Sequence, residues 1–88
     1  MAWRIEFHPD AERDLSRLDR QVQRRIIRFL YDRLLTIPDP RKLGAPLTGN
    51  LKGLWKYRAG DWRVIAHIRS ERLMIYIVRV GHRKEIYD

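Results

Sequence analysis

The last third of the chain, LWKYRAGDWRVIAHIRSERLMIYIVRVGHRKEIY at residues 54–87, decides the fold. It contains three apolar runs rich in β-branched and aromatic residues, at residues 54–58, 62–68 and 73–80. The turn-forming Ala59-Gly60-Asp61 separates the first two runs, and the polar segment 69–72 separates the last two. Short runs divided by turn residues predict an antiparallel meander of three strands.

Alternation along these runs sorts their side chains onto two faces, because successive residues of a strand point in opposite directions. In the middle run, the predicted core face carries Trp62, Val64, Ala66 and Ile68. Arg63 falls on the opposite face, Lys56 and Arg58 share a face of the preceding run, and residues 82–84 are basic. These cations are predicted to converge into one electropositive patch that suits a polyanion.

The first part of the chain predicts one strand and a helical hairpin. Residues 3–7 alternate as a short strand does, and Pro9 fits the first turn of a helix, with His8 as a turn or cap residue. Asp19 is the expected N-cap of a second helix. Apolar residues recur at helical spacing, as Ala11, Leu15 and Leu18 in the first helix and Val22, Ile26, Phe29, Leu30 and Leu34 in the second.

Prolines and glycines crowd residues 36–50, which are therefore expected to form a connecting loop with neither helix nor strand. The predicted order is β-α-α-β-β-β within a single domain at residues 1–88. The predicted fold class is two-layer α+β, with the N-terminal strand and the helical hairpin packed on a small, mainly antiparallel sheet.

The composition favours an acidic partner and limits the available chemistry. The net charge of +8 over 88 residues suits contact with nucleic acid. There is no cysteine and there are three scattered histidines, so we expect neither a metal site nor a cofactor. No apolar run is long enough to cross a bilayer and no signal peptide is recognisable, so we expect a cytoplasmic protein without a membrane partner. The five arginines of the second helix are interpreted as a solvated face, with contact to a partner surface as the alternative: Arg20, Arg24, Arg25, Arg28 and Arg33.

Cationic residues around the meander are the candidates for chemistry. RNA carries its own nucleophile, the 2′-hydroxyl, so a protein cleaves it by positioning, charge stabilisation and proton transfer. Arginines clamp phosphates in bidentate geometry. Considered alone, these residues fit a binding patch at least as well as an active site: Lys52, Lys56, Arg58, Arg63, His82, Arg83 and Tyr87.

The string WKYRAGDWRVIAHI, followed after one strand by VRVGHRKEIY, resembles the RelE branch of the RelE/ParE toxin superfamily. The resemblance spans nearly the whole chain and implies a RelE-like fold. It also implies the toxin of a type II toxin–antitoxin module, a metal-independent endoribonuclease that cuts mRNA in the ribosomal A site. The implied partners are a cognate antitoxin, the ribosome and mRNA.

Position by position, the resemblance implies catalytic roles for Lys56, Arg63, Arg83 and Tyr87, and His82 is added to the catalytic candidates for proton transfer. The cationic patch adds three candidates for RNA binding: Lys52, Arg58 and Lys84. The branch carries a second lysine where this chain has Leu54, so the general base is left open between Lys52 and His82. Two alternatives remain open for the function as a whole. One is a ParE-type toxin that poisons DNA gyrase, and the other is a non-enzymatic nucleic-acid-binding module.

Overall fold

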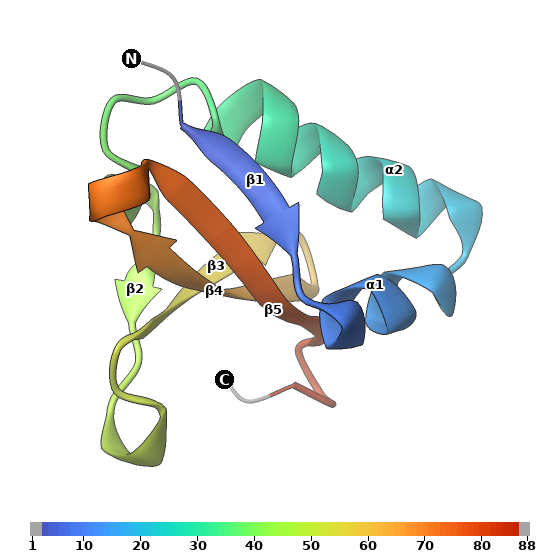
Figure 1. Cartoon of the computed structure of the whole chain (residues 1–88). Helices are drawn as coiled ribbons and strands as arrows, with labels where there is room; N and C mark the ends of the chain where they lie inside the picture. Colours follow the sequence, from blue (N-terminus) through green and yellow to red (C-terminus); the bar gives the residue numbers. More distant parts are fainter. Residues whose placement is uncertain (1–2, 87–88) are drawn as a thin grey trace.

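A five-stranded sheet organises residues 3–86, the part of the chain that the computed structural model describes (Figure 1). The strands are β1 (Arg4–Phe7), β2 (Ala45–Pro46), β3 (Leu54–Ala59), β4 (Trp62–Arg69) and β5 (Met74–His82), in the spatial order β1-β5-β4-β3-β2. β1 runs parallel to β5, and the other neighbours are antiparallel. The predicted α+β class and the meander are therefore confirmed, with each meander strand ending one or two residues beyond its predicted end.

Two helices follow β1 and begin at their predicted caps. The N-cap of α1 (Pro9–Ser16) is His8, whose Nδ1 accepts the backbone N–H of Asp10 at 2.9 Å. The N-cap of α2 (Arg20–Arg28) is Asp19, and α2 continues into a π-helical turn at Phe29–Leu34. The side-chain amide of Gln23 donates to the carbonyls of Leu15 and Leu18, both at 2.9 Å, and so closes the predicted hairpin.

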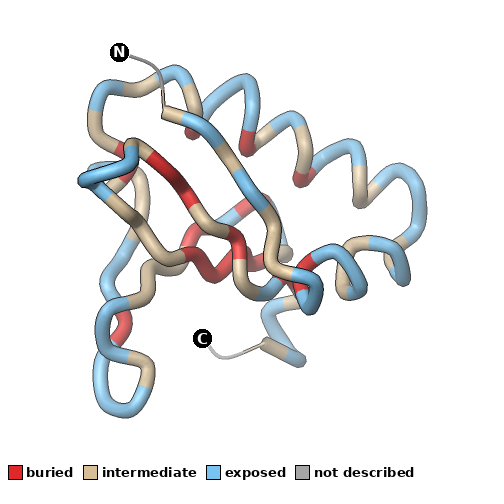
Figure 2. The backbone as a smooth tube through the Cα atoms, in the orientation of Figure 1, coloured by how far each residue is buried: buried red, intermediate tan, exposed pale blue. Residues whose placement is uncertain are grey.

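The core lies between these helices and one face of the sheet (Figure 2). Ile26, Leu30 and Leu34 are fully buried on the inner side of the second helix, as their spacing predicts. The facing strands contribute Tyr57, Val64, Ala66, Ile75, Ile77 and Val80. The Tyr57 hydroxyl donates to the Pro40 carbonyl at 2.8 Å, and burial raises the pKa of this phenol. Tyr57 therefore ties the segment before β2 to the centre of the sheet.

Residues 36–50 differ from the predicted loop without helix or strand. They contain a 3₁₀ turn at Pro40–Leu43 and the two-residue strand β2. Another 3₁₀ turn, Gly49–Leu51, begins near their end and runs one residue beyond them. β2 pairs Ala45 with Lys56 and Pro46 with Trp55. Proline is tolerated there because β2 is the edge strand, where a missing N–H costs no bond within the sheet.

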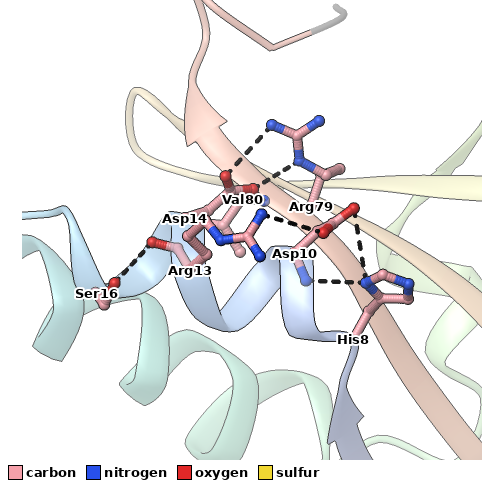
Figure 3. A network of polar contacts seen from close by, with 7 residues as sticks. All are labelled: His8, Asp10, Arg13, Asp14, Ser16, Arg79 and Val80. Atoms are coloured by element: carbon pink, nitrogen blue, oxygen red, sulfur yellow. Dashed lines mark hydrogen bonds and ion pairs between the residues drawn. The ribbon is translucent and has the colours of Figure 1, made fainter.

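Asp14 fastens α1 to the part of β5 that β1 does not reach (Figure 3). β1 pairs with β5 only as far as Ile77, so the N–H of Val80 has no strand partner on that side. The Asp14 carboxylate accepts this N–H at 2.9 Å and the Nε of Arg79 at 2.8 Å. Burial works to raise the pKa of Asp14, but the hydrogen bonds from Arg79 and Val80 outweigh it and hold that pKa below its usual value.

The second face of the sheet lies opposite the helices and carries the basic residues. The strand register aligns Lys56 with Ile65 and Arg79, and Arg58 with Arg63 and Gly81, across β3, β4 and β5. In β5 the extra residue Val78 shifts the alternation, so that Arg79 points away from the core while Val80 points into it. None of the described helices is long and apolar enough to span a membrane.

Candidate functional site

Three arginines gather around the turn between β3 and β4, residues 59–61. Gly60 takes a φ of 65° there, a left-handed conformation that favours glycine. Arg58 and Arg63 are cross-strand partners that flank this turn on the second face of the sheet. Arg83, which follows β5, brings the third guanidinium to the same turn. The turn is therefore the point where the predicted cations of the meander meet.

The C-terminal turn, residues 82–86, docks on the β3–β4 turn through Arg83. The Arg83 backbone N–H donates to the Asp61 carbonyl at 2.9 Å, and its Nε lies 3.8 Å from Asp61 Oδ1. Both side chains are more than half exposed, at 52% and 65%. An exposed pair of this length contributes little to stability, so a phosphate group can replace Asp61 beside the Arg83 guanidinium.

Arg63 is buried, with 3% of its surface exposed, and this differs from the expected exposed patch. Its Nη1 donates to the Gly60 carbonyl at 3.0 Å and to the Trp62 carbonyl at 3.3 Å. Its cross-strand partner on β5 is Gly81, which has no side chain, and Ile86 folds back over this glycine. A Cβ on Gly81 would lie 3.3 Å from Ile86 Cβ. In this arrangement Arg63 supports the β3–β4 turn from beneath.

Lys56 and Arg58 lie toward the outer edge of β3. Arg58 is exposed and Lys56 is half-buried. Both line a hollow at this edge together with Phe29 and Arg33 from the helical layer. The structure therefore places these two predicted residues between the β3–β4 turn and the second helix.

His82 lies on the face of the sheet that is opposite to Arg63. Its strand partner is Trp62, and the two rings meet edge to face with centroids 5.2 Å apart. Its Nδ1 accepts the backbone N–H of Lys84 at 3.1 Å. Only Nε2 therefore remains for a substrate, and the structure does not bring His82 together with Lys56 and Arg63.

The remaining predicted residues occupy three different places. Lys52 is exposed in the loop that precedes β3, and the six residue steps from Lys52 to Arg58 span about 20 Å when extended. Lys84 is exposed in the C-terminal turn, next to Arg83. Tyr87 lies outside the described residues. The structure thus separates Lys52 from the arginines and leaves Lys84 beside them.

Two contributors to this site were absent from the sequence-based prediction. Asp61 accepts the backbone N–H of Arg83 and lies beside its guanidinium, and Ile86 packs over Gly81. The Gly60-Asp61 dipeptide marked the turn, but its pairing with Arg83 depends on the register between β4 and β5. Within residues 3–86, no group of three histidines, aspartates or glutamates is positioned to hold a metal ion. The arrangement offers guanidinium and ammonium groups, which bind and stabilise phosphate oxygens.

Comparison with known proteins gives consistent matches over nearly the full length. A family model described as the ParE toxin of the type II toxin–antitoxin system parDE matches residues 5–87. Toxin RelG of Mycobacterium tuberculosis is 31% identical over 87 residues, which are 99% of this chain and 98% of that protein. Toxin RelE of the same organism is 34% identical over 85 residues, covering 97% of this chain and 86% of that protein.

Among solved structures, the RelBE2 toxin–antitoxin complex of M. tuberculosis contains a similar chain. The TM-score is 0.85 at 29% identity, and the match covers 94% of this chain and 100% of that chain. The similarity therefore extends over nearly the whole fold.

Proposed function

Because the chain belongs to the RelE/ParE family of toxins of type II toxin–antitoxin systems, we propose that it is an endoribonuclease that cuts mRNA in the ribosomal A site. The observation that carries this proposal is the convergence of Arg58, Arg63 and Arg83 on the β3–β4 turn. Such a cluster suits a reaction in which negative charge develops on a phosphate. The place of action would be the cytoplasm, where mRNA is translated.

In the proposed reaction, the 2′-oxygen of one nucleotide attacks the adjacent phosphorus and the bond to the 5′-oxygen breaks. The products are a 2′,3′-cyclic phosphate and a 5′-hydroxyl, and no metal ion is required by this balance. The exposed guanidinium of Arg83 stabilises the charge on the phosphorane. Arg58, Lys56 and Lys84 hold the flanking phosphates, and Arg63 keeps the β3–β4 turn in place beneath them.

Proton transfer is the least complete part of this site. Lys52 lies in the loop before β3, too far from the arginines to share in it, and His82 has Nε2 as its one available nitrogen. We propose that His82 or Tyr87 moves the proton, and that Tyr87 also stacks on a base, as the family resemblance implies. A site with so little acid–base chemistry of its own benefits from a ribosome that holds the message near in-line geometry. Cleavage is therefore expected to depend on the ribosome.

A cognate antitoxin is the second partner that we propose. The similar chain of M. tuberculosis was solved in a toxin–antitoxin complex, which supports a partner of the same kind here. With a net charge of +8, the chain would attract an acidic segment that folds as it binds.

Replacement of Arg83 by Ala tests the enzymatic proposal. Loss of one preorganised donor lowers the rate by about 10²–10³-fold, while loss of an exposed arginine changes the free energy of unfolding by less than about 0.5 kcal/mol. Arg72→Ala is the matched control, because Arg72 is also an exposed arginine that follows a strand of the meander, at the opposite end of β5. We expect Arg83→Ala to be folded, to stop arresting growth and to lose A-site cuts in a translation extract, whereas Arg72→Ala keeps both.

Full toxicity and unchanged cutting by Arg83→Ala at matched expression would contradict the assigned site. A gyrase-directed toxin is then the second candidate, favoured by the ParE description of the matching family model. Inhibition of DNA supercoiling by purified gyrase, with intact mRNA in the translation extract, would establish that alternative.

A further inference from the structure

A cationic groove runs between the second helix and the outer edge of β3. It consists of two adjoining hollows of about 490 and 280 Å³, which share Phe29, Arg33 and Arg58. Arg25 and Arg28 line one end and Lys56 lines the other. None of the residues that line either hollow carries a carboxylate. We refer to this feature as the α2–β3 groove.

The helix presents these arginines because its opposite side is buried. Ile26, Leu30 and Leu34 face the sheet with no exposed surface, so residues at intermediate positions line the groove or point to solvent. The Arg25 side chain lies against Gly60, since a Cβ on Gly60 would lie 2.7 Å from Arg25 Nη1. The groove therefore begins at the same β3–β4 turn that Arg83 contacts.

Three arginines of the groove have no acidic neighbour within the described part of the chain. Among residues 3–86, no aspartate or glutamate lies within ion-pair distance of Arg28, Arg33 or Arg58. All three side chains are exposed and lie in one groove, where their like charges repel one another. An arrangement of this kind is stabilised when an extended anion occupies it.

We infer that the α2–β3 groove binds the sugar–phosphate backbone of RNA, outside the position of the scissile phosphate. This inference rests on the proposed function, which makes RNA the partner of the chain. All but one of the cations in the groove are arginines, whose planar guanidinium binds phosphate oxygens in bidentate geometry. Half-buried Phe29 lines both hollows, and the exposed part of its ring offers a surface on which a base can stack.

RNA suits the groove better than an acidic protein segment does. A segment that folds on binding must bury apolar side chains to offset its loss of conformational entropy. Within the described part of the chain, Tyr31 is the only large hydrophobic residue that is largely exposed, with 41% of its surface accessible. The groove gathers five cations and no carboxylate, and such charge supplies most of the affinity for a nucleic-acid backbone.

The test compares two double substitutions that remove the same charge. Arg28→Gln with Arg33→Gln changes the groove, and Arg13→Gln with Arg72→Gln changes two exposed arginines that do not line it. Arg25 is left intact because its side chain packs against Gly60 in the β3–β4 turn. Binding is measured over a range of salt concentrations to ribosomes and, separately, to a free message that carries 2′-O-methyl groups and so cannot be cleaved.

Loss of two phosphate contacts reduces the slope of log K against log salt by about 1.4 for a single strand and 1.8 for a duplex. We therefore expect the groove variant to bind at least about tenfold more weakly near 0.1 M salt, with the control variant close to the parent protein. If the groove variant binds ribosomes more weakly but binds the free message as the parent protein does, the backbone belongs to ribosomal RNA. Weaker binding to both ligands identifies the message, and either result supports the inference.

Three outcomes would overturn it. One is equal weakening in the groove and control variants, which shows that only total charge matters. The second is unchanged RNA binding with reduced affinity for the antitoxin, which assigns the groove to a protein partner. The third is no binding of RNA by the parent protein. Failure of the proposed function is detected in a different measurement, because the parent protein would then leave translated mRNA uncut.

Discussion

Replacing Asp14 with Asn should destabilise the fold by about 2 kcal/mol near neutral pH, a loss that can be worked out from its contacts. The carboxylate accepts hydrogen bonds from Arg79 at 2.8 and 3.3 Å and from the Val80 N–H at 2.9 Å. Hydrogen bonds to a charged group contribute about 1.5–3 kcal/mol, but the side chain of Arg79 is 57% exposed, which reduces its share. For a domain of this size, the melting temperature should fall by roughly 8–16 °C.

The pH dependence of this loss provides an independent test. The pKa of Asp14 is lowered in the folded protein, so its contribution is present above the pKa of an unfolded aspartate, about 3.9. The contribution disappears as the pH falls through the lower folded pKa. The free energies of unfolding of the parent and Asp14→Asn should therefore converge in acid, and denaturant titrations between about pH 7 and pH 2.5 measure this.

Glu12→Gln is the matched control, because it removes one carboxylate from the exposed side of the same helix. We expect it to change the free energy of unfolding by less than about 0.5 kcal/mol. The assignment of Asp14 as the residue that joins α1 to β5 would be refuted if Asp14→Asn lowered the free energy of unfolding no more than Glu12→Gln does. It would also be refuted if a larger decrease stayed constant down to low pH.

Two further substitutions test the centre of the fold and the β3–β4 turn. Tyr57→Phe removes a buried hydroxyl and leaves the Pro40 carbonyl without its donor. We therefore expect the free energy of unfolding, measured by denaturant titration, to fall by about 1–2 kcal/mol. A decrease of less than about 0.5 kcal/mol would argue against this hydrogen bond. Gly60→Ala places a methyl group at a positive φ and against Arg25. We therefore expect the free energy of unfolding to fall by about 1–2 kcal/mol and mRNA cleavage to decrease. Unchanged stability together with unchanged cleavage would contradict the role of this turn.

The elements of the fold that depend on local sequence could be predicted. The spacing of Ile26, Leu30 and Leu34 predicted the buried side of the second helix, and all three are fully buried. His8 and Asp19 were recognisable as caps because their side chains accept N–H groups only two residues away. β2 was missed because its two residues contain a proline and its pairing is with a distant strand.

The candidate site could be predicted in composition but only in part in geometry. The period of two placed Arg63 on the correct face, yet an alternating pattern does not indicate how deeply a residue on that face is buried, and Arg63 is only 3% exposed. The extra residue Val78 in β5 likewise follows from pairing with β4. The arginines of the second helix had been interpreted as a solvated face, because their approach to Arg58 depends on how the helix packs across the sheet.

The parallel pairing of β1 with β5 sets the order in which the molecule can acquire its structure. Arg4 pairs with Met74, so the first strand has no neighbour until roughly 70 further residues have been synthesised. Contacts between such distant segments slow folding, because the entropy of closing a long loop is lost before the pairing forms. A nascent chain that stops before residue 74 has neither β5 nor Arg83. If Arg83 acts as we propose, a fragment left by interrupted synthesis would be inactive, and toxicity would require a chain that extends through β5 and the turn beyond it.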